Sequence, residues 1–234
     1  MTTAQGPDPK DLERVAQAAL TRVADGMILG LGTGRAAEAF IDALGRRVRG
    51  GLRVKGVPTS NRSAELARRV NIEVVTLEEI VRLDIAFDGA DEVTPELELT
   101  KGLGGALLRE RVVAFEADVF VVLVTPEKLV PRLGSRTPIP IEVVPFASPS
   151  ASRHLIKLGG TPAVRKKADG YPYMTDNQNW ILDTDFGPID APSLIETAVR
   201  KIPGVVDTGL FLGMADVVLV GEPGQVRELK RSRL

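Results

Sequence analysis

Three short segments of the sequence combine residue types that could do chemistry. The first, residues 30–34 (GLGTG), follows a short apolar run and precedes a predicted helix. Glycines let the backbone approach an anion, and a helix N-terminus offers free N–H groups. A dinucleotide-binding fingerprint would need glycine at position 35, which is Arg35 here. The segment predicts a site for a small phosphate-bearing ligand; a tight strand-to-helix turn is the alternative.

The second segment, residues 88–92 (DGADE), follows an apolar strand predicted at 83–87. Ligands of open parallel sheets bind outside the carboxyl ends of the strands, so this segment is well placed for function. Its three acidic residues repel one another unless a ligand, a cation or water shares them. A magnesium site is one interpretation, since carboxylates suit that ion. An acidic turn that caps the following segment is another.

The third segment, residues 101–110 (KGLGGALLRE), places a lysine and several glycines before a helix. Lys101 and free backbone N–H groups could together stabilise a developing oxyanion. On the predicted helix, Glu110 shares a face with apolar side chains, and partial burial would raise its pKa toward that of a general base. The structural alternative is that Glu110 pairs with Lys101, Arg109 or Arg111 at the rim of the core.

The composition excludes several classes of protein. The chain of 234 residues has no cysteine, which excludes disulfides, thiolate zinc sites and cysteine nucleophiles. Its single histidine, His154, excludes multi-histidine metal sites, and we assign it no role. A net charge of -1 and 4% aromatic residues argue against nucleic-acid binding. Without an apolar run of about 20 residues or an apolar signal core, we expect a soluble cytoplasmic protein with no membrane partner.

Short apolar strands alternate with helices through the first half of the chain. Strands are predicted at 27–29, 54–57, 72–75, 83–87 and 119–124, and helices at 11–24, 36–44, 62–69 and 105–117. Continuous apolar strands are typical of a parallel sheet covered on both faces. The pattern predicts an α/β fold with an open, mostly parallel Rossmann-like sheet and helices on both faces.

The pattern changes after Pro131, where prolines become frequent. Helices at 150–158 and 191–201 and strands near 162–166 and 180–184 predict a smaller α+β unit. Residues 210–220 return to sheet character, and a short final helix is predicted at 223–230. We expect a Rossmann-like catalytic domain of residues 1–131 and 208–234, and a smaller α+β (ferredoxin-like) domain of residues 132–207.

Taken together, the segments resemble ribose-5-phosphate isomerase of type A. The resemblance rests on GLGTG at 30–34, PTS at 58–60, FDGADE at 87–92, KGLGGALLRE at 101–110, IEVVP at 141–145, TDN at 175–177, ILD at 181–183, PGVV at 203–206 and TGLF at 208–211. These segments run in order through almost the whole chain. The resemblance implies an aldose–ketose isomerase of the non-oxidative pentose phosphate pathway that interconverts ribose 5-phosphate and ribulose 5-phosphate.

The resemblance also implies roles for individual residues. Glu110 moves a proton between C2 and C1 through an enediolate, and Asp88 and Asp91 handle hydroxyl protons and ring opening. Lys101 and the N–H groups of residues 102–105 stabilise the oxyanion. The residues implied in substrate binding are Thr33, Gly34, Arg35, Ala36, Gly89, Ala90, Gly102, Leu103, Gly104 and Lys128. The first four and Lys128 are implied mainly at the phosphate end.

Members of the family need no metal or other cofactor and form homodimers or homotetramers. The resemblance therefore favours proton handling over a magnesium site at the aspartates.

The chain departs from the family pattern at the phosphate end. Arg35 and Ala36 stand where the family usually has Ser-Thr, Leu12 stands where it usually has lysine, and Leu103 replaces a glycine. Arginine binds phosphate well, so affinity can survive this change. An isomerase for a related sugar phosphate and a non-catalytic sugar-phosphate sensor are the alternatives. The retained Glu110 and Lys101 disfavour the sensor, which needs no base.

Overall fold

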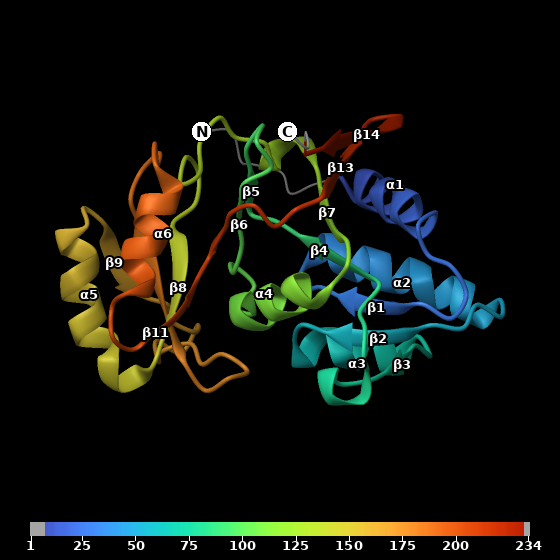
Figure 1. The fold of residues 1–234 in the computed structure, drawn as a ribbon, viewed down its shortest axis with the longest axis horizontal. Coiled ribbons are helices and arrows are strands. Elements are labelled where there is room, and N and C mark those ends of the chain that lie inside the picture. The colour runs from blue at the N-terminus through green and yellow to red at the C-terminus, as the bar shows by residue number, and fades with distance from the viewer. Residues whose placement is uncertain (1–7, 232–234) are drawn as a thin grey trace.

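A computed structural model describes residues 8–231 and shows a seven-stranded sheet at the centre of the larger part (Figure 1). Its strands are β1 (Ile28–Leu31), β2 (Lys55–Pro58), β3 (Glu73–Val74), β4 (Ile85–Gly89), β7 (Phe120–Val124), β13 (Val217–Glu222) and β14 (Gln225–Lys230), in the order β14-β13-β7-β4-β1-β2-β3. All neighbours are parallel except β13 and β14. The strand order reverses between β1 and β4, where open α/β sheets bind ligands.

Helices cover both faces of this sheet, as the apolar strands predict. Helices α1 (Pro9–Leu20), α2 (Arg35–Arg49) and α3 (Asn61–Arg69) share one apolar core with one face, and α4 (Leu107–Glu116) packs on the other. Every residue of β7 is buried, because alternate side chains enter the two cores. Phe40 of α2 stacks on Phe87 of β4 with ring centroids 4.2 Å apart.

A second, antiparallel sheet forms the smaller part of the molecule. It contains β8 (Ile139–Val143), β9 (Thr161–Val164), β10 (Trp180–Asp185) and β11 (Val205–Thr208) in the order β11-β8-β10-β9. Helices α5 (Ser148–Lys157) and α6 (Pro192–Arg200) pack on it, and α5 lies at the end of the molecule away from the large sheet (Figure 1). This is the α+β arrangement predicted after Pro131. That residues 132–207 form a separate domain stays a prediction.

A third, small sheet lies between the other two and was not predicted (Figure 1). It consists of β5 (Glu92–Val93), β6 (Leu99–Thr100) and β12 (Leu210–Phe211). Strands of two residues are too short to show a hydrophobic period. Three 3-10 helices, η1 (Leu77–Glu79), η2 (Pro126–Lys128) and η3 (Pro145–Ala147), complete the elements of residues 8–231. No helix within residues 8–231 has both the length and the apolar character needed to cross a lipid bilayer.

The predicted helix at 223–230 is wrong: this segment is the strand β14. It pairs along its whole length with β13, from Glu222 opposite Gln225 to Val217 opposite Lys230. Arginine, glutamate and lysine favour helices, but the pairing edge of β13 outweighs that preference. The Pro-Gly turn at 223–224, with a φ of 82° at Gly224, reverses the chain between the strands.

We predict that Gly221→Ala destabilises the fold, because Gly221 lies where α1 crosses β13. A Cβ atom there would lie 2.4 Å from the carbonyl oxygen of Asp11 in α1, so the helix would have to move. Such overpacking costs about 1–3 kcal/mol of unfolding free energy, measurable by urea denaturation. The exposed Gly50→Ala is the control, with an expected change within about 0.5 kcal/mol. Equal stabilities of the two variants would contradict the prediction.

Candidate active site

A pocket of about 270 Å³ opens at the carboxyl ends of β1 and β4, the point where the strand order reverses. Every residue predicted to bind substrate lines it: Thr33, Gly34, Arg35, Ala36, Gly89, Ala90, Gly102, Leu103, Gly104 and Lys128. Asp91, Lys101 and Glu110 line it as well. Asp88 is not part of the lining and reaches the pocket through its contact with Lys101.

Three buried side chains with ionisable groups lie together at the bottom of the pocket. The Nζ atom of Lys101 lies 3.0 Å from Oδ2 of Asp88 and 3.4 Å from Oε2 of Glu110. It also donates a hydrogen bond of 2.6 Å to the carbonyl oxygen of Gly89. The residues Lys101, Asp88 and Glu110 are 2%, 2% and 4% exposed. Glu110 therefore pairs with Lys101 inside the molecule and does not face bulk solvent.

Neither neighbouring arginine pairs with Glu110 in the described part of the chain. Arg109 donates to Asn177 and to the carbonyl of Asp176, and Arg111 forms an ion pair with Asp207. The rim pairing with an arginine that the sequence left open is therefore not formed.

Three different elements bring these groups together. Asp88 ends the buried part of β4, Lys101 directly follows β6, and Glu110 lies in the first turn of α4. The Oδ1 atom of Asp88 accepts hydrogen bonds from the backbone N–H groups of Thr33 at 3.0 Å and Gly89 at 2.7 Å.

Gly32 makes room for the Asp88 carboxylate. A Cβ atom at position 32 would lie 2.2 Å from Oδ1 of Asp88, so any side chain there would displace the carboxylate. One glycine of the GLGTG segment thus serves this carboxylate and not a ligand directly.

Burial and neighbouring charges set the protonation of the group. Burial raises the pKa of Glu110 to about 8; Lys101 lowers the pKa, and the like charges of Asp88 and Asp91 raise it further. Burial alone would lower the pKa of Lys101, but the attraction of Asp88 and Glu110 outweighs it and raises that pKa. The lysine therefore stays charged, while Glu110 exchanges its proton near neutral pH.

Asp91 holds the loop of residues 102–105 at the mouth of the pocket. Its Oδ2 atom accepts a hydrogen bond of 3.0 Å from the N–H of Leu103, and burial raises its pKa. The N–H of Gly105 donates to the carbonyl of Gly102. The N–H groups of Gly102 and Gly104 have no acceptor among residues 8–231, so these two are free to bind a ligand oxygen.

The opposite end of the pocket is suited to an anion. Gly34, with a φ of 102°, precedes α2, and no side chain caps the helix. The first N–H groups of this 15-residue helix therefore face the pocket, together with Arg35 and Lys128. Arg35 is exposed and makes no ion pair with the residues that the structure describes. Leu12 of α1 lines the pocket as well.

The Pro58-Thr59-Ser60 segment supports the first loop. The Oγ1 atom of Thr33 lies 2.8 Å from both the Thr59 and Ser60 hydroxyl oxygens. The sequence reasoning missed Leu123, Val124 and Thr125, which line the pocket at the end of β7. Only their position could have indicated them, because they lie at the carboxyl end of β7, the strand next to β4 in the sheet. His154 is exposed on α5, with Nδ1 2.9 Å from the carbonyl oxygen of Ser150.

The acidic cluster that suggested magnesium is not formed. The carboxylate of Glu92 accepts hydrogen bonds of 2.6 Å from the N–H groups of both Gly134 and Arg136, away from Asp88 and its lysine. Within residues 8–231, no three side chains of the types that commonly bind metals are grouped to hold an ion.

The chain is similar to known proteins over most of its length. A family model described as ribose 5-phosphate isomerase A (phosphoriboisomerase A) matches residues 55–225. A protein of Thermomicrobium roseum named ribose-5-phosphate isomerase A is 49% identical over 222 residues, which cover 94% of each chain. The chain belongs to the ribose 5-phosphate isomerase A family.

Solved structures of the family share the whole fold. Ribose 5-phosphate isomerase A from Methanocaldococcus jannaschii is 44% identical with a TM-score of 0.90, covering 95% of this chain and 100% of that one. A D-ribose-5-phosphate isomerase in complex with phospho-erythronic acid is 38% identical with a TM-score of 0.93, covering 97% and 100%. The family and the α/β fold class inferred from the sequence are confirmed.

We predict that Glu110→Gln stabilises the protein, and more so as pH rises from about 5 to about 8. In this window the unfolded chain releases the Glu110 proton while the folded chain, with its pKa raised from 4.5 to about 8, retains it. The wild-type free energy of unfolding therefore falls with rising pH, and glutamine removes that loss. Urea denaturation of both proteins across the window measures the difference. A difference independent of pH would contradict the assigned pKa.

Proposed function

We propose that this chain interconverts ribose 5-phosphate and ribulose 5-phosphate by moving one proton between C2 and C1 of the open sugar. The observation that carries the proposal is the buried Glu110 carboxyl beside Lys101, in a pocket whose opposite end is suited to phosphate. A buried carboxyl with a pKa of about 8 is a suitable base near neutral pH. Membership of the ribose 5-phosphate isomerase A family supports the substrate.

Glu110 is the proposed base. Its carboxylate removes the C2 proton, and the electron pair moves through the new C1–C2 double bond to the aldehyde oxygen, giving an enediolate. The resulting carboxylic acid returns the proton to C1, and the ketone forms at C2. Substrate and product have the same atoms and no net electron transfer, so the step needs no oxidant or reductant.

Two further groups complete the proton balance. The C2 hydroxyl must lose its proton and the C1 oxygen must gain one. Asp91 lines the pocket and has a raised pKa, so it is the proposed carrier of hydroxyl protons and assists ring opening. Asp88 keeps the ammonium of Lys101 in place and takes part through that contact.

The oxyanion of the enediolate is stabilised by fixed donors. Lys101 supplies a positive charge that Asp88 and Gly89 hold in place. The free N–H groups of Gly102 and Gly104 supply two further donors. Donors held in a water-poor site stabilise developing charge without reorganising during the reaction.

The proposed phosphate site is the N-terminus of α2, with Arg35 and Lys128 of the pocket lining as its charged side chains. The positive end of the helix dipole and its free N–H groups bind anions, and a guanidinium matches phosphate geometry. In this chain Arg35 takes the place of the hydroxyl donors that the family usually offers at positions 35 and 36.

The cytoplasmic location expected from the composition and the homodimer or homotetramer implied by the resemblance both belong to this proposal, with family membership as support. Light scattering on the purified protein distinguishes the assemblies.

Replacing Glu110 by glutamine is expected to lower kcat by about 10²–10⁴-fold with KM largely unchanged, because the shape stays and the base is lost. The assay follows ribulose 5-phosphate formation from ribose 5-phosphate in chelator-treated buffer. In the wild type, kcat/KM should rise with pH as Glu110 ionises, reach half its maximum near pH 8 and level off above that pH. Glu116→Gln, an exposed change on the same helix, is the matched control. Turnover of Glu110→Gln close to wild type would refute the assignment.

Replacing Arg35 by serine tests the phosphate end. We expect KM for ribose 5-phosphate to rise, by about tenfold for the loss of one charge-assisted hydrogen bond, while kcat changes little. Arg49→Ser, an exposed change at the other end of α2, is the control. Unchanged KM would show that Arg35 does not bind the phosphate. Including other pentose and hexose phosphates in the assay shows whether Arg35 alters the substrate range.

A further inference from the structure

An arginine at the end of a strand of the four-stranded sheet contacts the loop of residues 102–105. Arg165 directly follows β9, and its Nη1 atom donates hydrogen bonds to the carbonyl oxygens of Gly102 at 2.9 Å and Leu103 at 3.1 Å. Its side chain is only 13% exposed. These are contacts between the smaller α+β part of the molecule and a loop that lines the pocket.

The guanidinium is fixed from behind by Asp183 of β10. The Nε atom of Arg165 lies 2.8 Å from Oδ2 of Asp183, and Nη2 binds Oδ1 of the same carboxylate. The backbone N–H of Arg165 also donates to the carbonyl of Ile181 at 2.8 Å. A two-point arginine–carboxylate pair holds the plane of the guanidinium, so Nη1 has a defined direction.

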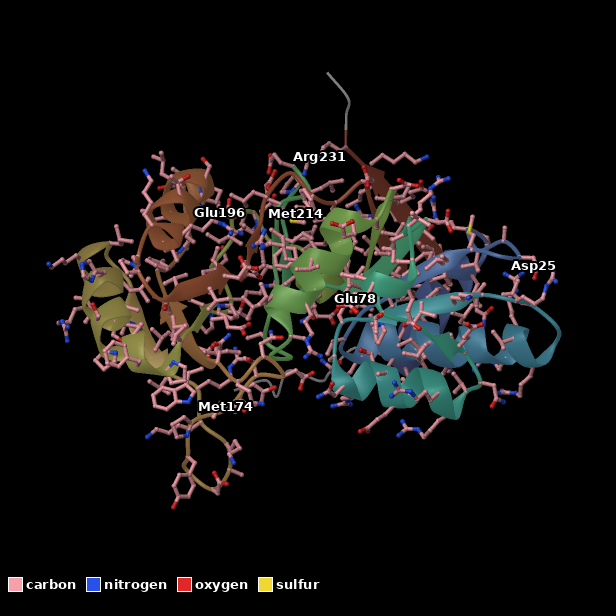
Figure 2. The ribbon with its side chains drawn as sticks, turned by 60° about the horizontal axis from the view of Figure 1, so that its bottom comes forward. Asp25, Glu78, Met174, Glu196, Met214 and Arg231 are labelled. Atoms are coloured by element: carbon pink, nitrogen blue, oxygen red, sulfur yellow. The ribbon has the colours of Figure 1, made fainter. Side chains whose placement is uncertain are left out.

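The same polypeptide segment is held at further points along α3 and α4. In Figure 2 the label Met174 marks this segment, which connects β9 to β10 and projects from the four-stranded sheet. Arg109 of α4 donates to Asn177 at 2.9 Å, and the N–H of Asn61 donates to Asp176 at 2.8 Å. The segment between β9 and β10 is therefore attached to α3 and α4 as well as to the loop of residues 102–105.

The two carbonyls that Arg165 binds belong to two consecutive peptide planes. In a trans peptide the C=O and the N–H of the next residue point in opposite directions. With the Gly102 carbonyl on Arg165, the N–H of Leu103 points away from it, to Asp91 at 3.0 Å. With the Leu103 carbonyl on Arg165, the N–H of Gly104 points away in the same manner and has no acceptor in the described chain.

The loop needs a contact that fixes its peptide planes, because its glycines permit more than one backbone conformation. Gly102 and Gly104 flank the two peptides, and glycine permits conformations in which a peptide plane is turned over. Asp91 holds the N–H of Leu103, but in the described chain only the contact of Arg165 with the Leu103 carbonyl fixes the peptide that carries the N–H of Gly104.

We propose that Arg165, fixed by Asp183, is a positioning residue that turns the N–H of Gly104 toward the oxyanion and the N–H of Leu103 toward Asp91. It touches neither substrate nor reacting atoms and acts through the loop. The inference rests on the proposed function, because it assigns a role in that same reaction. It gives the four-stranded sheet an indirect part in catalysis, through the loop of residues 102–105. The charge of Arg165 also lowers the pKa of Asp91, against the larger effect of burial.

The test compares Arg165→Met with a matched control, Arg47→Met. Arg47 likewise donates to two backbone carbonyls, those of Leu20 and Val23, but lies outside the site. We expect Arg165→Met to lower kcat by about 10²-fold, the order expected for misplaced catalytic groups, with KM changed by less than about threefold. Arg47→Met should keep wild-type kcat and KM. Arg165→Lys, which retains a donor without the fork, should lie between wild type and Arg165→Met.

A second measurement separates positioning from general destabilisation. Phospho-erythronic acid carries a carboxylate that resembles the charged oxygens of the enediolate, and its Kd is measured by calorimetry. Arg165→Met should weaken its binding by the factor lost from kcat/KM, and Asp183→Asn should weaken it less, in the same direction. If Arg165→Met does not fold, Arg165→Lys and Asp183→Asn provide the same comparison.

The kinetic and binding measurements together test the positioning role of Arg165. Wild-type kcat and inhibitor Kd in the Arg165 variants would overturn it, as would a loss confined to KM or an equal loss in Arg47→Met. If wild type binds phospho-erythronic acid without isomerising ribose 5-phosphate, the proposed function fails, and weaker binding by Arg165→Met still supports the positioning role. If wild type does neither, both proposals fail.

Discussion

The structure depends on one buried contact, the ammonium of Lys101 between the carboxyl groups of Asp88 and Glu110. Burying one cation with two anions is costly, and the cost is lowest when one carboxyl keeps a proton. Glu110 is that carboxyl, with the longer contact to the lysine and a pKa raised to about 8. The Glu110 carboxyl can therefore gain and lose a proton near neutral pH while the ion pair between Lys101 and Asp88 stays formed.

Everything around this contact serves to place its three members. Asp88 comes from the large parallel sheet, Lys101 from the small sheet between the two larger ones, and Glu110 from the start of α4. Arg111 anchors α4 to Asp207 and lies with its guanidinium carbon 4.1 Å from the centre of the Phe211 ring, which also lies 5.6 Å from the lysine nitrogen. Elements far apart in the chain therefore converge on one point.

The two ends of the pocket are built on different principles. At the reacting end, buried charges and fixed donors leave little freedom for substitution. At the proposed phosphate end, the N-terminus of α2 has no side-chain cap, and the backbone N–H groups of a helix N-terminus attract anions. If the backbone supplies most of the phosphate contact, as proposed, Arg35, Ala36 and Leu12 can differ from the residues that the resemblance leads us to expect there.

The sequence by itself determined the parts that depend on local pattern. Apolar runs such as 119–124 predicted the parallel sheet, and the order of motifs identified Asp88, Lys101 and Glu110 and the loops that line one pocket. The tertiary structure alone decided that β14 is a strand, since its pairing with β13 outweighs helix preference. It also decided that Glu92 turns away from Asp88, and that Arg165 reaches the 102–105 loop. These contacts join residues that are distant in sequence, so neither hydrophobic periodicity nor motif spacing can predict them.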